Sequence, residues 1–335
     1  MAEGMTWTVA DGDQLTQAEI YGEVLSQLGD KYPEIIALTA DLAGSTKIGR
    51  FGKKFPDRFI NVGIAENTMF GMAAGLAMAG FTPVVSTFAV FTALRSAEQV
   101  RTDICYQNLN VKIISSHAGL SFGQAGSTHH CTEDIAVMRS FANMIVIVPA
   151  DGIETGNAVA AAMEWPGPVY IRIGRGFEPT VHTTQDYGFE IGKAVTMRDG
   201  SDVTLIGCGV GVKHCMQAAD VLQQQGLSAR VIDMHTIKPI DKEAILKAVM
   251  DTRRIITVED HNIYGGMGSA VADVIVEAGK ACAFKKLGVP DAYSIVGYPE
   301  DLYHYYKFDA DGIVETVSEL MKMEIEEDED WEDET

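Results

Sequence analysis

A chain of 335 residues is longer than one compact core usually is, so we expect two domains. The net charge of −21 repels phosphate backbones and anionic lipid surfaces, which argues against nucleic acid and membranes as partners. Five cysteines form no Cys-x-x-Cys pair and the N-terminus lacks a signal-peptide pattern, so we predict a soluble, cytoplasmic protein.

The first half of the chain alternates apolar runs with helical patterns. After a helix at 16–28, strands are predicted at 34–39, 59–62, 82–87, 111–116, 144–148 and 169–173. Helices are predicted at 65–79, 92–106, 132–141 and 154–164. Near-continuous apolar strands between helices are typical of a parallel sheet covered on both faces, so this half is predicted to be a doubly wound α/β domain.

A polar stretch that begins near residue 176 marks a linker to a second, smaller α/β unit. Its strands are predicted at 203–207, 229–234, 254–258 and 294–296, and its helices at 212–225, 242–249, 268–278 and 311–322. Nine of the last twelve residues are acidic, which predicts a disordered tail. The expected organisation is an N-terminal extension (1–12), a first domain (13–178), a linker (179–193), a second domain (194–323) and the tail (324–335).

Polar and aromatic side chains follow the ends of the predicted strands of the first domain. In chain order they are Asp41 and Ser45, Glu66, Phe88 and Phe91, His117, and Arg175. Any one of them alone would be read as a loop or core residue. Because ligands bind outside the carboxyl ends of parallel strands, the set as a whole predicts a shared site.

Glu66 stands at the junction between a short strand and a helix rich in Gly, Ala and Met, with no obvious charge partner nearby. By position alone, an acid in a first helical turn complements the helix dipole and needs no function. The alternative is a catalytic carboxylate surrounded by Ile64, Met69, Phe70 and the pair Phe88 and Phe91. Such surroundings would raise its affinity for a proton and suit it to share one with a ring nitrogen.

Two further stretches allow a structural and a functional interpretation. Phe88 and Phe91 are core residues by default, or a platform for a flat heteroaromatic ligand. The glycine-rich loop at 116–130 carries His117, His129 and His130; it is a candidate for binding a hydroxylated or phosphorylated substrate, and no standard ligand set for a metal completes it.

Basic and acidic groups elsewhere are less specific. Arg172 and Arg175 are a surface pair by default, although Arg175 at a strand end could bind a phosphate. The acidic stretch at 259–261, followed by glycines at 265–268, does not fit a nucleotide-binding loop and is predicted to be a strand-to-helix turn.

Five short motifs together resemble the transketolase family of thiamine diphosphate enzymes. They are DLAGS at 41–45, GIAE at 63–66, STFAVF at 86–91, GSTH at 126–129 and IRIGR at 171–175. The resemblance runs from about residue 15 to residue 320 and covers the C-terminal half of a transketolase. It implies a parallel-sheet pyrimidine-binding domain followed by a smaller, mixed-sheet C-terminal domain.

The resemblance also implies roles for the residues at the strand ends. Glu66 would hydrogen-bond N1′ of the aminopyrimidine and so activate the cofactor, which carries a two-carbon ketol unit from a ketose to an aldehyde. His129 would contact the ketol oxygens of the donor. The implied cofactor-binding residues are Asp41, Ile64, Glu66, Phe88 and Phe91, and the implied substrate-binding residues are Ser45, His117, His129 and Arg175.

Departures from the family pattern bear on the substrate. Members acting on pentose phosphates usually carry an Arg where this chain has Gln17 and an Asp where it has Ala125. The Arg would be a phosphate ligand and the Asp would read a substrate hydroxyl, so a modified sugar or a different acceptor is implied.

The resemblance leaves out the domain that holds the cofactor's diphosphate. The Gly-Asp-Gly mark of that domain is absent from the sequence. The resemblance therefore implies a split enzyme, in which an N-terminal transketolase subunit provides the diphosphate site and its Mg²⁺ or Ca²⁺, in an α2β2 assembly acting on sugar phosphates.

Rival interpretations are the beta subunit of a 2-oxo acid dehydrogenase, a deoxyxylulose-phosphate synthase, a non-catalytic module that kept the fold, and a metal-binding module built on the three histidines. The GSTH loop favours transketolase over the dehydrogenase, and the synthase is usually a single chain. The retained polar residues at the strand ends argue against a non-catalytic module.

Overall fold

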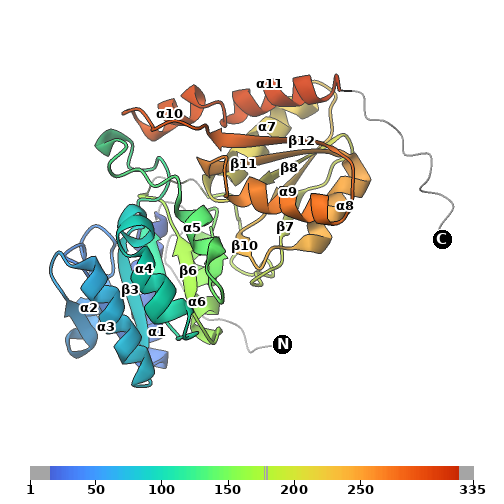
Figure 1. Ribbon diagram of the computed structural model, residues 1–335. Helices are drawn as coiled ribbons and strands as arrows, with labels where there is room; N and C mark the ends of the chain where they lie inside the picture. Colours follow the sequence, from blue (N-terminus) through green and yellow to red (C-terminus); the bar gives the residue numbers. More distant parts are fainter. Residues whose placement is uncertain (1–15, 177, 179, 324–335) are drawn as a thin grey trace, which may run out of the picture.

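The computed structural model describes residues 16–176, 178 and 180–323. The predicted N-terminal extension and acidic tail lie outside the described residues. Two α/β domains follow one another along the chain (Figure 1), as the sequence predicts. One sheet has seven strands and the other five.

The first domain is built on a sheet in the order β10-β5-β6-β4-β3-β1-β2, in which every pair is parallel except that of β10 (Thr236–Lys238) with β5. Its own strands are β1 (Ile35–Thr39), β2 (Phe59–Asn61), β3 (Thr82–Phe88), β4 (Lys112–Ser116), β5 (Ile145–Ile147) and β6 (Val169–Arg172). Its α-helices are α1 (Gln17–Lys31), α2 (Gly49–Lys54), α3 (Glu66–Met78), α4 (Ala97–Gln99), α5 (Asp134–Ser140) and α6 (Gly152–Glu164).

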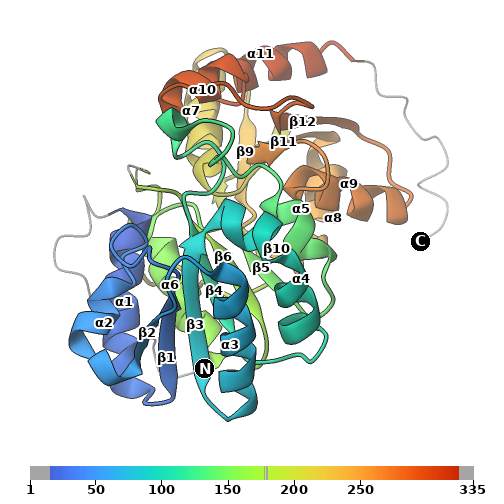
Figure 2. The same cartoon turned by 60° about the vertical axis from the view of Figure 1, so that its left-hand side comes forward.

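Alternate residues of the central strands point into two separate apolar layers, one on each face of this sheet. In β1, Ile35 and Ala37 pack with α1 and α6, whereas Ile36 and Leu38 pack on the side of α3 and α5. The helices covering the two faces are visible in Figure 2. This is the doubly wound arrangement predicted from the near-continuous apolar strands.

The second domain has a mixed sheet in the order β12-β11-β8-β9-β7, in which only β7 is antiparallel. Its strands are β7 (Val195–Arg198), β8 (Val203–Gly207), β9 (Ala229–Asp233), β11 (Arg254–Asn262) and β12 (Ala283–Val289). Its helices are α7 (Val210–Gln224), α8 (Lys242–Thr252), α9 (Met267–Glu277), α10 (Pro299–Tyr305) and α11 (Ala310–Leu320).

The two domains share a strand and a core. Strand β10 (Thr236–Lys238) follows β9 in sequence but pairs antiparallel with β5 of the first sheet. One buried apolar cluster contains Ile113 and Met144 of the first domain together with Ile232 and Met267 of the second. Because they share buried apolar surface, the domains hold the groups at their junction in fixed positions.

Two predicted elements are wrong in detail. The helix predicted at 92–106 is broken into a π-helical turn (Phe91–Arg95), the short α4 and a second π-helical segment (Val100–Cys105). The strand predicted at 294–296 is not a strand; the edge strand is β12. Across the described residues, no helix is long and apolar enough to cross a membrane.

Candidate functional site

Glu66 begins α3 and is nearly inaccessible to solvent, with 3 % of its surface exposed. Gly63, at φ +74°, makes the turn between β2 and this helix. Among the described residues, the carboxylate has one hydrogen-bond partner, the guanidinium of Arg95, with 2.8 Å between Nη1 and Oε1. The prediction that Glu66 has no charge partner nearby is therefore wrong. Glu66 lies in the first turn of α3, as the helix-dipole interpretation requires, but among the described residues its carboxylate makes no hydrogen bond to the helix backbone.

A cluster of five rings lies beside this acid; we call it the aromatic cluster. Phe88 and Phe91, from the end of β3 and the π-helical turn, have ring centres 5.7 Å apart, and Phe88 stacks on His117 at 4.0 Å. Phe122 packs against His117, and His129 lies edge-on to both Phe91 and Phe122. The cluster brings together four of the residues predicted from the sequence and adds Phe122.

Two arginines flank the aromatic cluster. Arg95 lies over the Phe91 ring, with 4.4 Å from Cζ to the ring centre, and Arg175 lies over Phe122 at 4.9 Å. Both side chains are exposed. The half-buried Phe91 ring of the aromatic cluster is thus linked through Arg95 to the Glu66 carboxylate. The exposed guanidinium of Arg175, which lies over Phe122, could bind an anionic group.

His117 is buried and neutral. Its backbone has φ +58°, and its Nδ1 lies 2.9 Å from Ser116 Oγ. Burial lowers the pKa of His117 from 6.5 to about 3, and the nearby Arg175 and His129 add to this effect. At neutral pH the ring can therefore give a phosphate a hydrogen bond, but no positive charge of its own.

The loop between His117 and Cys131 is held by contacts within itself and by contacts with the second domain. Gly119 and Cys131 form an isolated antiparallel bridge. His130, the third histidine of the loop, is buried; its Nε2 lies 2.9 Å from the Gly123 carbonyl and its Nδ1 2.5 Å from Ser294 Oγ. Its ring is thus used to hold the loop, which leaves His117 and His129 as the histidines of the aromatic cluster.

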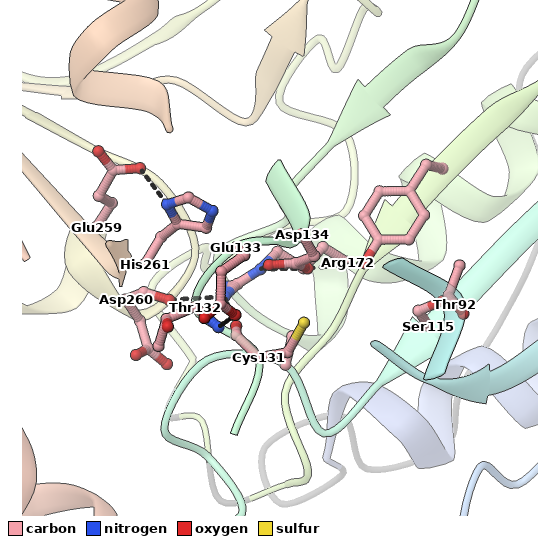
Figure 3. A network of polar contacts seen from close by, with 12 residues as sticks. Thr92, Ser115, Cys131, Thr132, Glu133, Asp134, Arg172, Glu259, Asp260 and His261 are labelled. Carbon is pink, nitrogen blue, oxygen red and sulfur yellow. Dashed lines mark hydrogen bonds and ion pairs between the residues drawn. The ribbon is translucent and has the colours of Figure 1, made fainter. Parts of the chain in front are cut away.

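A buried ion pair between Arg172 and Asp134 lies next to this loop and supports it (Figure 3). Arg172 Nε lies 2.9 Å from Asp134 Oδ2, and its Nη2 donates to the backbone carbonyls of Cys131 and Asp260. Arg172 is 6 % exposed, so the prediction of a surface arginine pair holds only for Arg175. Asp134 also accepts a hydrogen bond from Tyr170.

Asp260 of β11 completes this support. Both of its carboxylate oxygens lie 3.0 Å from the Leu120 amide, and its approach requires a glycine at 119, where a Cβ would lie 2.0 Å from Oδ2. Burial raises the pKa of Asp260 to about 7, against the opposing effect of Arg172. The strand-to-helix turn predicted after this stretch is present, with Glu259 accepting from the first amides of α9.

A cleft of about 390 Å³ opens beside the aromatic cluster, between the two domains. Its lining includes Phe122, Arg175 and Glu178 from the first half of the chain and Tyr298 and Tyr303 from the second. It is mixed in character, with ring surfaces and charged ends. A sugar phosphate, which has a carbon skeleton and an anionic end, matches such a lining.

The remaining predicted residues lie at the neighbouring strand ends. Asn61 links the turns after β1 and β2, because its Oδ1 accepts from the amides of Asp41 and Gly63, both at 3.0 Å. Ile64 is 80 % exposed, whereas Glu66, two residues further on, is buried. Ser45 is exposed, and no described hydrogen bond or ring contact joins it to the aromatic cluster.

Three residues of this site were not predicted from the sequence: Asn61, Arg95 and Phe122. Asn61 gave a weak signal, as a polar residue at the end of a strand before a glycine. Phe122 lies within the glycine-rich loop that was singled out, and it is the only aromatic carbocycle there. Arg95 gave none, because its contact with Glu66 depends on the π-helical turn.

Gln17 and Ala125, the two departures from the family pattern, have different structural surroundings. Gln17 is 2 % exposed; its Nε2 donates to the Pro149 carbonyl and its Oε1 accepts from the Gly174 amide. It therefore fixes the backbone next to Arg175 and is not free to bind a phosphate. Ala125 lies in the loop with His129 and has no polar side chain to offer a substrate.

The residues present fit one half of thiamine diphosphate. A buried carboxylate next to the half-exposed Phe91 ring suits a flat, nitrogen-containing heterocycle, which can stack and share a proton. The uncovered Ile64 adds apolar surface for the same ligand. These features are compatible with an aminopyrimidine ring at this position.

Comparison with known proteins gives two family matches. The transketolase pyrimidine-binding domain matches residues 13–178, and the transketolase C-terminal domain matches residues 192–313. The chain is 42 % identical over 305 residues to a putative transketolase C-terminal section of Methanocaldococcus jannaschii, covering 91 % of this chain and 96 % of that protein.

Two further relatives are similar over nearly their whole length. An apulose-4-phosphate transketolase subunit of Phocaeicola vulgatus is 39 % identical over 302 residues, or 90 % of this chain and 96 % of that protein. A solved structure, described as a split gene transketolase in an inactive beta4 tetramer, has a TM-score of 0.83 at 41 % identity and covers 92 % of this chain and 98 % of its own.

Proposed function

Because the chain belongs to the transketolase family, as the C-terminal section of a split enzyme, we propose that with an N-terminal subunit it transfers a two-carbon ketol unit from a ketose phosphate to an aldose. Thiamine diphosphate, when bound, supplies the electron sink that carries the ketol unit. This chain binds the aminopyrimidine end and most of the substrate.

The observation that carries the proposal is the buried Glu66 carboxylate beside the aromatic cluster. Glu66 would hold the N1′ side of the pyrimidine by sharing a proton with it, and Phe91 and Ile64 would offer apolar surface to the ring. Phe88 supports Phe91 from the core side, and Asp41 lies at the neighbouring turn, held by Asn61. Burial strengthens the hydrogen bond of Glu66 by excluding water.

The substrate lies between the aromatic cluster and the interdomain cleft. Nδ1 of His129 is 3.0 Å from Thr128 Oγ1, which leaves Nε2 for the ketol oxygens. Arg175 binds the phosphate, and the neutral His117 adds a hydrogen bond; Ser45 contributes from the next turn. The positive charge at this end of the site thus comes from the exposed guanidinium of Arg175.

The N-terminal partner supplies the diphosphate site and its Mg²⁺ or Ca²⁺, in an α2β2 assembly. Support comes from the face around α3, where large apolar side chains are exposed: Ile64, Met72, Met78, Leu94 and Tyr106. Exposed apolar surface of this extent is typical of an interface. The solved relative described as an inactive beta4 tetramer also supports the need for another kind of subunit.

The sugar is one that common pentose phosphate enzymes do not use. Gln17 is tied into the backbone and Ala125 has no polar group, so two contacts usual in the family are missing. A relative that is 39 % identical is described as acting on apulose 4-phosphate, which supports a modified sugar. We propose a ketose phosphate whose recognition does not need those two contacts.

The test is reconstitution with the matching N-terminal subunit, thiamine diphosphate and Mg²⁺. Ketose phosphates, including apulose 4-phosphate and common pentulose phosphates, are offered with a range of aldose acceptors, and products are followed by mass spectrometry. We expect ketol transfer and no release of carbon dioxide. Decarboxylation of 2-oxo acids in place of ketol transfer would support the 2-oxo acid dehydrogenase alternative instead.

A further inference from the structure

A second cluster of acids and a histidine is buried at the junction of the domains, away from Glu66. Glu154 comes from α6 of the first domain, His182 from the connection between the domains, and Asp233 from the end of β9 in the second. All three are at most 4 % exposed. Their side-chain nitrogen and oxygen atoms lie within 4.8 Å of one another.

The three side chains point toward one another, but not all of their polar atoms form hydrogen bonds. His182 Nε2 lies 3.5 Å from Asp233 Oδ2 and 3.8 Å from Glu154 Oε1. His182 Nε2 and both carboxylate oxygens of Asp233 have no hydrogen-bond partner in the described structure. A buried carboxylate without a partner is costly, so either a proton shared with the neighbouring Glu154 or a cation must offset its charge.

We propose that Glu154, His182 and Asp233 bind one divalent transition-metal ion that joins the two domains. Ligands about 2.1 Å from a tetrahedral metal lie about 3.4 Å apart, close to the separations measured here. One imidazole nitrogen with two carboxylate oxygens is a donor set that suits Zn²⁺, Mn²⁺ or Fe²⁺. Water completes the coordination.

The groups behind the ligands are arranged as around metal sites. Nδ1 of His182, opposite the proposed ligand atom, lies 3.2 Å from Asp151 Oδ2 and so can donate to a carboxylate. Tyr187 stacks on the imidazole at 4.2 Å and donates its hydroxyl to Glu154 Oε1 at 2.8 Å. These contacts fix the imidazole plane and one carboxylate before any ion arrives.

The ion has a structural role in this arrangement. Its ligands come from both domains and from the connection, and none of them belongs to the aromatic cluster or lines the cleft. Binding only to the assembled domains, it stabilises the folded chain by mass action. The rival occupant of the same position is a proton shared between Asp233 and Glu154.

The test uses the full-length chain after treatment with a chelator, titrated with Zn²⁺ by calorimetry and with Co²⁺ by visible absorption. We expect one tight site per chain, a rise in melting temperature on adding Zn²⁺, and a Co²⁺ spectrum without thiolate charge-transfer bands. Thiolate bands would assign the ion to buried cysteines and overturn the proposal. Absence of a stoichiometric metal site would also overturn the proposal. It would favour a proton shared between Asp233 and Glu154 as the occupant of this position.

Variants locate the ion. His182→Asn and Asp233→Asn should lose the tight site, whereas His304→Asn, in an exposed His–Asp cluster, should keep it. Tyr187→Phe keeps all three ligands and should weaken binding by about 10–100-fold, which gives a readout if the ligand variants fail to fold. Unchanged Zn²⁺ affinity in His182→Asn and Tyr187→Phe would contradict the assignment.

Discussion

The guanidinium of Arg95 holds the carboxylate of Glu66 at 2.8 Å while lying over the Phe91 ring. The pair joins the π-helical turn to the first residue of α3. In the proposed cofactor complex, the same carboxylate would hydrogen-bond a ring nitrogen of the pyrimidine. We therefore predict that Arg95 releases Glu66 when the pyrimidine binds.

Replacing Arg95 tests this exchange. Arg95→Gln should bind thiamine diphosphate in the reconstituted assembly at least as tightly as the unmodified chain, measured by calorimetry. Because Arg95 is 48 % exposed and the Gln amide can still donate to the buried Glu66 carboxylate, the loss in free energy of unfolding should stay at about 1 kcal/mol. Weakening of cofactor binding by more than tenfold would mean that Arg95 contacts the cofactor itself.

His117 should stay neutral through the physiological range. Its folded pKa of about 3 lies below the ordinary 6.5, so the unfolded chain takes up a proton that the folded chain does not. This part of the stability is present above pH 6.5 and is lost as pH falls toward about 3. Urea unfolding at pH 7 and pH 5 should therefore show a smaller pH effect in His117→Gln than in the unmodified chain.

Magnetic resonance of histidine-labelled protein checks the same point directly. The His117 ring, assigned by its absence in His117→Gln, should keep neutral chemical shifts between pH 8 and pH 5. Titration of this ring near pH 6.5 in the ligand-free chain would contradict the buried environment.

The ion pair between Asp134 and Arg172 should be essential for stability. Both side chains are buried, so Asp134→Ala leaves an uncompensated arginine and should cost about 3–5 kcal/mol in urea unfolding. The half-exposed pair of Glu23 and Arg50 is the control, and Glu23→Gln should cost no more than about 1 kcal/mol. Similar losses in the two variants would argue against a special role for the buried pair.

Gln17 should behave as a structural residue. Gln17→Ala leaves the Pro149 carbonyl and the Gly174 amide without their partner and should cost about 1–3 kcal/mol in free energy of unfolding. Gln224→Ala, at an exposed position near the end of α7, serves as the matched control. If Gln17→Ala is as stable as the control but raises the KM for a ketose phosphate, Gln17 is a substrate ligand after all.

Several features were predictable because they depend on local pattern. The strands of the first sheet are continuous apolar runs, and three residues of the aromatic cluster, Phe88, Phe91 and His117, stand at or just after strand ends that a parallel sheet brings to one edge. The edge strand β12 was missed since Lys285, Lys286 and Gly288 make it polar, as is common at sheet edges. Residues 294–296 have the β-branched pattern of a strand but lie against the loop at 123–127.

Other features depend on contacts between distant segments. Strand β10 has three residues and exists only because β5 offers a free edge, and the π-helical turn that aims Arg95 at Glu66 cannot be told from a regular helix in the sequence. The buried position of Arg172 follows from Asp134 and Asp260, one of which comes from the other domain. Such contacts have no local signal.

In the proposed enzyme, Glu66 activates the cofactor. The rate at which the C2 proton of thiamine diphosphate exchanges into deuterated water, measured in the reconstituted assembly by rapid quenching and magnetic resonance, tests it most directly. Glu66→Gln keeps the size of the side chain but cannot share its proton in the same way. We expect exchange to slow by at least about 100-fold, within the range for loss of an acid–base group, while the assembly stays intact. Exchange at the unmodified rate in an intact Glu66→Gln assembly would contradict the claim.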